Sequence, residues 1–436
     1  MNAGVKTLYG VQMMTAVLSC TGSTTVAIMI IRSEPKLESP SRRLIFGLSI
    51  SDILQSLPLV FGPLTTAPTE NGIKLFDIGT QTTCNVTGFT FNFGSMTCAS
   101  YTLFLSIYYL HAVKYKKPDK EFCNKIEKKL HFFGILYALT ISLIHLFLGN
   151  YNNIFHGSNC FTVERPVGCH LNPDVECERG EYAQTLSIFL SVIPVICMSL
   201  GIVYSLGSLY LFVKADGERQ QRRFTTSLMM NSRLSSESKH SFSRRLSSIV
   251  IPSIRLPSIR RSALKTSGTT KPGEELDEEE EEIKNIVSRL EGNIEEGGPT
   301  SMSANVFPVS TPTQYVTRAE RRSESVRRQT LAQALLYGGA YFFVYTMPIL
   351  AMSIWIRNGK NPPIGFLIGL NTVFPLQGLL NIFIYTRPQV RTLRVRHPEF
   401  SWRQAMIEVV KAGGEVPPKY QRRRRNKGPV QLRRTG

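Results

Sequence analysis

The sequence predicts an all-α membrane protein, a seven-transmembrane helix bundle with its N-terminus outside and its C-terminus inside. Three observations predict this fold. Seven stretches are apolar and almost free of charge, each has about the 20 residues that a helix needs to cross the hydrocarbon, and the loops between them alternate in basicity. The stretches are Thr7–Ile31, Leu44–Ala67, Thr82–Val113, Leu130–Gly149, Tyr182–Val213, Thr330–Ile356 and Pro362–Thr386.

The basic residues set the orientation. The first loop and the loop after the third stretch are rich in Lys and Arg: Arg32, Lys36, Arg42 and Arg43, then Lys114, Lys116, Lys117, Lys120, Lys125, Lys128 and Lys129. The alternate loops have few: Lys74, then Arg165 and Arg179, then Arg357 and Lys360. Basic loops are cytoplasmic by the positive-inside rule, so the N-terminus lies outside.

The first stretch has a competing interpretation as a signal peptide, because it begins close to the N-terminus. It is longer than the apolar core of an ordinary signal peptide, Lys6 is the only charge before it, and its removal would break the alternation of charge. We interpret it as the first transmembrane helix.

Composition alone would suggest a soluble basic protein, since mean hydropathy is near zero and the formal net charge is +19. These averages mix apolar spans with two polar cytoplasmic segments. We expect the positive charge at helix ends to meet anionic membrane lipid. The sequence contains no RNA- or DNA-binding motif, so nucleic acid is not an expected partner.

The predicted domains are helices one to five in residues 1–214, a cytoplasmic loop in 215–329, helices six and seven in 330–386, and a basic tail in 387–436. The loop has no sustained apolar period, so we expect it to be mostly disordered. Arginines precede Thr225, Ser247 and Ser323, which makes these residues candidates for phosphorylation. A solvated basic linker is the alternative interpretation. We interpret Arg422–Arg425 in the tail as a membrane-surface patch.

Four cysteines, Cys84, Cys160, Cys169 and Cys177, fall on the predicted outer face, where disulfides persist. Three pairings are open, and zinc binding is the weaker alternative. From the spacing we expect Cys84 to pair with Cys169, and Cys160 with Cys177. Asn85 begins the one N-x-[ST] sequon without proline, but its position beside Cys84 and the membrane argues against a glycan.

Asp52 is the one acidic residue in the middle of a predicted span. A carboxylate in hydrocarbon is costly, so such a residue normally faces the bundle interior and serves a function. Ser49, Ser51 and Asn381 offer it polar neighbours. The alternative is a protonated Asp bonded to a neighbouring helix. Pro194, Pro348 and Pro375 lie inside helices five, six and seven and permit kinks.

These residues resemble motifs of the G-protein-coupled receptors. Residues 48–54, Leu-Ser-Ile-Ser-Asp-Ile-Leu, resemble the rhodopsin-like helix-two motif, whose Asp binds sodium. Cys84 stands where the family has its helix-three cysteine, which bridges to the second outer loop, and Tyr108-Tyr109 stands at its inner helix-three motif. Pro348 resembles the helix-six kink proline, with Phe342 as the aromatic switch. Residues 380–385, Leu-Asn-Ile-Phe-Ile-Tyr, resemble L-N-P-x-x-Y and end at Tyr385.

Several positions depart from the rhodopsin-like pattern. Tyr109 replaces the arginine that contacts G proteins, Thr346 replaces a tryptophan, and Ser23 replaces an asparagine. Residues 376–381, Leu-Gln-Gly-Leu-Leu-Asn, are closer to the cyclic-AMP-receptor-like and secretin-like groups. The chain therefore resembles a divergent receptor. Helix seven has no lysine for a retinal Schiff base, so we expect no retinal and no other cofactor.

The resemblance implies a plasma-membrane receptor that senses an extracellular ligand and relays it by helix rearrangement to a heterotrimeric G protein or another effector. Asp52 and Asn381 would form an ion-binding polar core, Phe342 and Pro348 a hinge, and Tyr385 a latch. The alternatives are a seven-helix transporter or channel, and a receptor-like scaffold that does not couple to G proteins. An enzyme is not expected, because the sequence shows no catalytic motif.

Overall fold

The computed structural model describes residues 3–33, 37–65, 79–115, 122, 126–154, 159–166, 169, 175–245, 312–358 and 363–421. The chain divides into two compact units, residues 1–221 with 321–436, and residues 222–320. In the second unit, the described residues are the end of one helix and the start of another. The site lies in the first unit.

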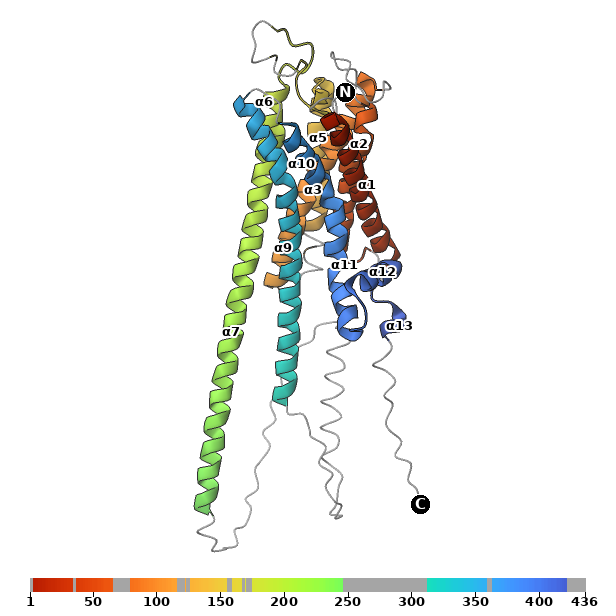
Figure 1. Ribbon diagram of the computed structural model, residues 1–436. Helices are drawn as coiled ribbons and strands as arrows, with labels where there is room; N and C mark the ends of the chain where they lie inside the picture. Colours follow the sequence, from red (N-terminus) through yellow and green to blue (C-terminus); the bar gives the residue numbers. More distant parts are fainter. Residues whose placement is uncertain are drawn as a thin grey trace, which may run out of the picture. The chain divides into compact units, whose positions relative to one another are not determined.

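The seven predicted stretches all form helices, in the predicted order (Figure 1). The first four are α1 (Ala3–Arg32), α2 (Pro40–Thr65), α3 (Gln81–Tyr115) and α5 (Lys128–Phe147). The fifth comprises α6 (Ala183–Ser187), the π-helical turn η4 (Ile188–Val192) and α7 (Ile193–Arg245), and the sixth is α9 (Pro312–Asn358). The seventh comprises α10 (Ile364–Val373), the 3₁₀ turn η5 (Phe374–Leu376) and α11 (Gln377–Arg396). The all-α prediction is confirmed.

Six of these helices are long and apolar enough to cross a membrane, judged over the described residues. The helix outside that set is α3, which is rich in Ser, Thr, Asn and Gly. Polar residues are tolerated there because α3 is enclosed. Met96, Thr97, Cys98, Ala99 and Ser100 are all buried, and α3 packs against both α2 and α5. A helix that has little lipid-facing surface needs fewer apolar residues.

Two helices pass the predicted loop boundaries. The sequence predicts that helix five ends near residue 214 and that helix six begins near 330, but α7 continues to Arg245 and α9 begins at Pro312. The extensions are rich in Arg and Ser and also contain Glu and Gln, and Arg, Glu and Gln have high helix propensity. The change from apolar to polar sequence therefore shows where the membrane span ends, but the helix itself continues beyond that point.

The three span prolines have different effects. Pro375 lies in η5, which interrupts helix seven, and Pro194 is the second residue after the π-helical turn η4. By contrast, α9 is helical on both sides of Pro348. Local 3₁₀ and π geometry is a common way to accommodate the backbone bond that proline removes.

Glycines allow the closest approaches between helices. A Cβ atom on Gly94 of α3 would lie 2.5 Å from the Gln55 backbone nitrogen in α2. A Cβ atom on Gly22 of α1 would lie 2.6 Å from the Gly378 carbonyl oxygen in α11. Both distances are below van der Waals contact, so these helix pairs require glycine.

Replacing Gly94 with alanine should destabilise the protein by about 1–3 kcal/mol, because the added methyl group overpacks the α2–α3 contact. The matched control is Gly339→Ala in α9, where an added Cβ meets nothing within 4 Å and alanine should stabilise the helix by about 0.5–1 kcal/mol. The Tm of both variants in one detergent checks the prediction. A lower Tm for Gly339→Ala than for Gly94→Ala would contradict the packing.

A two-stranded hairpin follows α5 and determines the disulfides. Strand β1 (Tyr151–Ile154) pairs antiparallel with β2 (Asn159–Thr162), and Gln81 at the start of α3 donates to the Tyr151 carbonyl at 2.9 Å. Cys160 therefore lies beside Cys84, and these two form a disulfide.

Cys169 pairs with Cys177 in the loop that follows the hairpin. Backbone bonds between Arg165 and Arg179 close this loop and bring the two cysteines together. The predicted pairs Cys84–Cys169 and Cys160–Cys177 are wrong, because cysteine spacing carries no information on the hairpin.

A short amphipathic helix, α12 (Trp402–Lys411), follows α11, and a single turn, α13 (Pro418–Gln421), ends the described residues. Ser401 and Gln404 form a capping box at the start of α12. Ala405 and Val409 of α12 are buried against Val390 and Leu393 of α11. The described part of the tail therefore packs on the end of helix seven.

Candidate functional site: a buried polar network around Asp52

Asp52 of α2 is 1% exposed and is the centre of a polar network. Its Oδ2 atom accepts hydrogen bonds from Asn381 Nδ2 of α11 and from Ser23 Oγ of α1, the latter at 3.3 Å. Its Oδ1 atom accepts from the Cys98 thiol of α3 at 3.1 Å. A single carboxylate thus links four helices. A buried carboxylate requires such partners, because it would be costly to bury without them.

The network extends from Asp52 through α3, α9 and α11. Gln377 Nε2 of α11 donates to Cys98 Sγ at 2.9 Å. The Tyr345 hydroxyl of α9 lies 3.3 Å from Gln55 Oε1 of α2 and 3.4 Å from the Ser95 carbonyl of α3. Helix six therefore contacts the same polar core as the helices around Asp52.

Ser19 of α1 and Ser56 of α2 form a further set of hydrogen bonds beside this network. Ser19 Oγ accepts from Ser56 Oγ of α2 at 3.0 Å and from the Gly378 backbone nitrogen of α11 at 3.1 Å. The second bond depends on the glycine contact between α1 and α11. Close packing and polar contacts therefore occur at the same level of the bundle.

Of the polar neighbours expected for Asp52, Asn381 bonds to it and two serines do not. Ser49 and Ser51 donate to carbonyl oxygens of their own helix, Ile45 and Gly47, each at 2.9 Å. Ser23 and Cys98 take their place. Ser23 is the residue that departs from the receptor pattern, whereas nothing in the local sequence distinguished Cys98 from an ordinary buried thiol.

These donors do not fit the sodium ion that the resemblance implies at Asp52. Both carboxylate oxygens accept protein donors, and neither a thiol nor an amide nitrogen suits a hard cation, which prefers oxygen ligands. The buried Gln377 Oε1 lacks a partner and could ligate an ion, but the carboxylate would first have to lose Cys98 and Asn381. Among the described residues, no group of three or more His, Cys, Asp or Glu could hold a metal ion.

Replacing sodium with choline at constant ionic strength should therefore leave the Tm of the protein unchanged. Asp52→Asn should lower the Tm equally in both salts, because it changes the hydrogen bonds and not an ion site. A sodium-dependent rise in Tm that disappears in Asp52→Asn would contradict this assignment.

The expected aromatic switch, Phe342, does not contact the polar core, whereas Tyr345 of the same helix does. Phe342 is half-buried and its ring makes an edge contact with Tyr341 at 5.4 Å. Tyr345 is 7% exposed, stacks on Tyr341 at 4.5 Å and reaches the polar core. Thr346 is exposed and bonds to the Phe342 carbonyl. Tyr345 is thus the helix-six aromatic residue that contacts the network, one helical turn beyond Phe342.

Tyr385, the expected latch, is 6% exposed at the basic end of helix seven. The tail turns back beneath it through Gly413 and Gly414, whose φ angles are +72° and +83°. A Cβ atom on Gly414 would lie 3.0 Å from Tyr385 Cε1. Next to this turn, Arg42 of α2 donates to Ser33 and pairs with Glu415. The tail therefore packs directly on the latch residue.

The inner motif of α3 is an aromatic cluster. Tyr108 and Tyr109 are 8% and 4% exposed, and the Tyr108 ring lies 5.2 Å from that of Phe122. Both tyrosines belong to one hydrophobic core together with Tyr337, Tyr341, Tyr345 and Tyr385. Aromatic packing occupies the place where the receptor pattern has a charged arginine.

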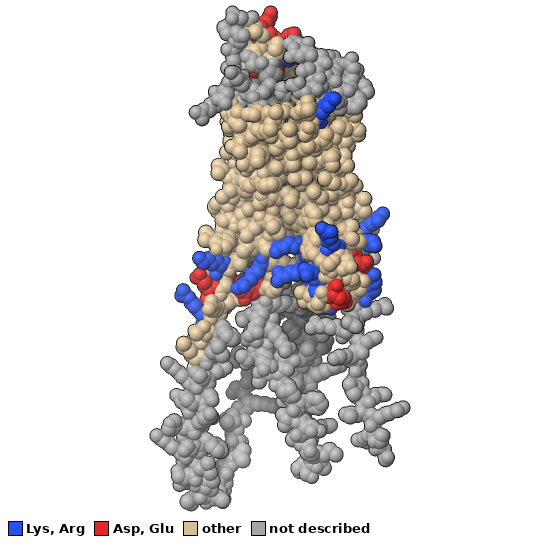
Figure 2. Space-filling model, in the orientation of Figure 1, with Lys and Arg blue, Asp and Glu red and all other residues tan. Residues whose placement is uncertain are grey.

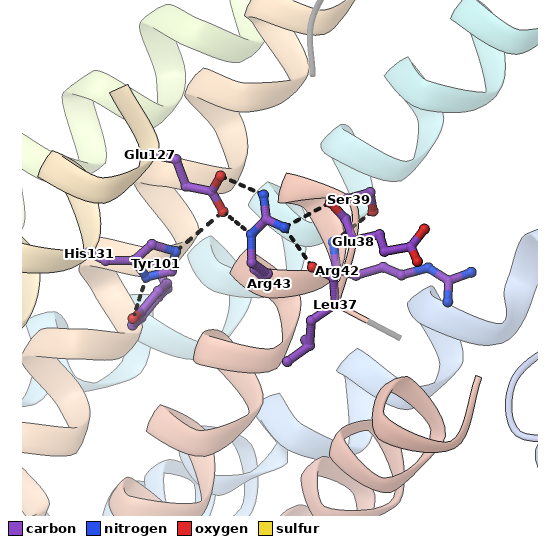
Figure 3. Close-up of polar contacts among 8 residues, drawn as sticks. All are labelled: Leu37, Glu38, Ser39, Arg42, Arg43, Tyr101, Glu127 and His131. Atoms are coloured by element: carbon purple, nitrogen blue, oxygen red, sulfur yellow. Dashed lines mark hydrogen bonds and ion pairs between the residues drawn. The ribbon is translucent and has the colours of Figure 1, made fainter. Parts of the chain in front are cut away.

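A second polar cluster joins α2, α3 and α5 at the basic end (Figure 3). Arg43 makes a bidentate ion pair with Glu127, at 2.6 and 2.8 Å, and donates to the Leu37 and Glu38 carbonyls. His131 lies 3.6 Å from Glu127 and 2.9 Å from the Tyr101 hydroxyl. Glu127 is 4% exposed. Sequence reasoning missed this cluster, because Glu127 lies within a lysine-rich segment and its partner is 84 residues away.

The remaining candidates lie away from these clusters. His145 is buried in α5 and contacts Asn150 Nδ2 at 3.0 Å. Asn85 Oδ1 accepts from Gln81 at 3.0 Å and from Arg179 at 3.4 Å. Thr225 is exposed on α7 and Ser323 lies in α9, whereas Ser247 and Arg422–Arg425 are outside the described residues.

The visible surface of the helix bundle has almost no charged residues, and Lys and Arg gather in a band along its lower edge (Figure 2). The first unit is thus a multi-pass membrane bundle with one strongly basic end.

No protein-family model matches the chain, and no curated protein sequence matches it. Among solved structures, the chain is similar to the crystal structure of squid rhodopsin, with 13% sequence identity and a TM-score of 0.47. That match covers 96% of this chain and 90% of the rhodopsin chain.

Proposed function

We propose that this protein is a G-protein-coupled-receptor-like signalling receptor of the plasma membrane. An extracellular ligand would shift the bundle between two arrangements, and the basic end would then recruit a heterotrimeric G protein or another cytoplasmic effector. This orientation places the hairpin and both disulfides outside, where an oxidising compartment maintains them.

The observation that carries the proposal is the network around Asp52. Its bonds join α1, α2, α3 and α11, and Tyr345 adds α9 through Gln55 and Ser95. A change in one helix position must therefore alter bonds in the others. Helix seven is also interrupted at η5, directly beside Gln377 of this network. Such a core has discrete hydrogen-bonding arrangements, which is what a two-state switch requires.

The path to the basic end runs along helix seven. Asn381 bonds to Asp52, and Tyr385, one turn later, belongs to the aromatic core and packs against the tail turn. Rotation of α11 that breaks the Asn381 bond would displace Tyr385 from this position. The basic end would then open toward an effector.

A transporter or channel is the competing function. Transporters place several ionisable groups along a path. Among the described residues, Asp52 is the one buried carboxylate inside a membrane span, and its hydrogen bonds are all to uncharged side chains. This supports a structural switch over a conduction path.

A ligand screen with nucleotide exchange on a panel of G proteins tests the proposal. Purified protein in proteoliposomes should accelerate exchange on at least one G protein when its ligand is present. Solute or ion flux in the same vesicles, without exchange on any G protein, would refute the receptor proposal and favour the transporter. Ligand-dependent recruitment of another cytoplasmic protein without exchange would favour the uncoupled scaffold.

A further inference from the structure

We propose that the groove between the basic ends of α9 and α11 binds the phosphorylated headgroup of a membrane phosphoinositide. The groove has a volume of about 650 Å³, which is within the usual range of small-molecule sites. Its orientation toward the inner leaflet rests on the proposed function.

Arginines from both helices line the groove. Arg387 and Arg391 are one turn apart on α11, Arg396 follows at the end of that helix, and Arg328 faces them from α9. The α11 lining residues are 384, 387, 388, 391, 392, 395 and 396, which follow the i, i+3, i+4, i+7, i+8 spacing of one helix face. This spacing arranges guanidinium groups along one wall, and guanidinium groups bind phosphate oxygens in a bidentate manner.

The α11 arginines are available for an anion. Arg387, Arg391 and Arg396 are exposed and form no ion pair with any carboxylate among the described residues. Glu324, the acidic residue of the lining, pairs with Arg328. The groove therefore holds a net positive charge that no described side chain of the protein neutralises.

The surroundings favour a lipid over a soluble anion or a peptide. On α11 the lining passes from the apolar Ile384 to Arg396 at the end of the helix, and a band of Lys and Arg borders the uncharged surface of the bundle (Figure 2). One turn of α9 beyond the lining residue Ala332, Leu335 and Leu336 are 43% and 38% exposed. A ligand with a phosphorylated head and apolar chains matches both parts of this surface, whereas a soluble anion would use only the arginines.

Binding of a short-chain phosphatidylinositol bisphosphate to the full-length protein in uncharged nanodiscs tests the proposal. Nanodiscs expose both membrane faces, so this result does not depend on orientation or on signalling. Short-chain phosphatidylserine and inositol trisphosphate are the comparison ligands. We expect the bisphosphate lipid to bind more tightly than either, because one lacks the additional phosphates and the other lacks the chains.

Matched double variants assign the site. Arg387→Gln/Arg391→Gln should weaken lipid binding about 25-fold, on the order of fivefold for each arginine. Arg403→Gln/Lys411→Gln removes the same charge from exposed positions on α12, outside the groove, and should leave affinity nearly unchanged. If the first double variant does not fold, Arg391→Gln and Arg396→Gln singly should each give the fivefold loss.

Three outcomes would overturn the proposal. Equal weakening by both double variants would indicate unspecific attraction to basic surface. Equal affinity for inositol trisphosphate would indicate a soluble anion as the ligand. Tight binding of a phosphorylated Ser/Arg peptide with no lipid binding would indicate a peptide site.

Discussion

The Cys84→Ser/Cys160→Ser double variant is expected to lose about 4–5 kcal/mol of stability, and Cys169→Ser/Cys177→Ser only about 2–3 kcal/mol. The difference follows from the loops that the disulfides close, which span 76 and 8 residues. Closing the longer loop removes more entropy from the unfolded chain. The first disulfide also attaches the hairpin to the start of α3, so its loss should release β2 from that helix.

The Tm values of the two double variants, measured in one detergent, check this order. Peptide mapping without reduction should recover Cys84 linked to Cys160. An equal loss of Tm in both variants, or recovery of Cys84 linked to Cys169, would contradict the structure.

Arg43→Gln should destabilise the bundle by about 3–5 kcal/mol, because it removes the bidentate partner of a buried carboxylate. Glu127 keeps only 5% of its side chain exposed, so water cannot replace the guanidinium. The change would also remove the two hydrogen bonds by which Arg43 of α2 holds Glu127 at the start of α5.

Arg42→Gln is the matched control for this variant. Arg42 is the neighbouring residue, but its partner Glu415 is 37% exposed at the side chain, and exposed pairs contribute about 0–1 kcal/mol. Arg43→Gln/Glu127→Gln should recover much of the lost stability, because it removes the buried carboxylate together with its bidentate partner. If Arg43→Gln unfolds no more easily than Arg42→Gln, the ion pair does not support the bundle.

The number and order of the helices were predictable from the sequence, because a membrane span must be long and apolar. Polarity also identified Asp52 as the centre of the site, since an acidic residue in a span needs partners. Asn381 was found through the resemblance in helix seven. These predictions depend on single residues or on local patterns.

The other parts of the site depend on tertiary contacts that local patterns do not record. In the sequence, Cys98 cannot be distinguished from an ordinary buried residue of a helix. Its bond to Asp52 becomes evident only when α3 packs against α2. Which aromatic residues of α9 face the core, Tyr341 and Tyr345 and not Phe342, depends on the rotation of α9. Cysteine pairing depends on the hairpin, and the Arg43–Glu127 pair joins two helices that are distant in sequence.

Ligand-dependent nucleotide exchange by the Asp52→Asn variant, beside wild-type protein in identical proteoliposomes, tests the central claim most directly. Asp52→Asn keeps the volume of the side chain but changes its bonds with Ser23, Cys98 and Asn381. The account predicts that the variant still binds the ligand and fails to transmit it, so that exchange remains at the unliganded rate. Ligand-dependent exchange equal to that of the wild type, with equal ligand affinity, would contradict a signalling role for the network.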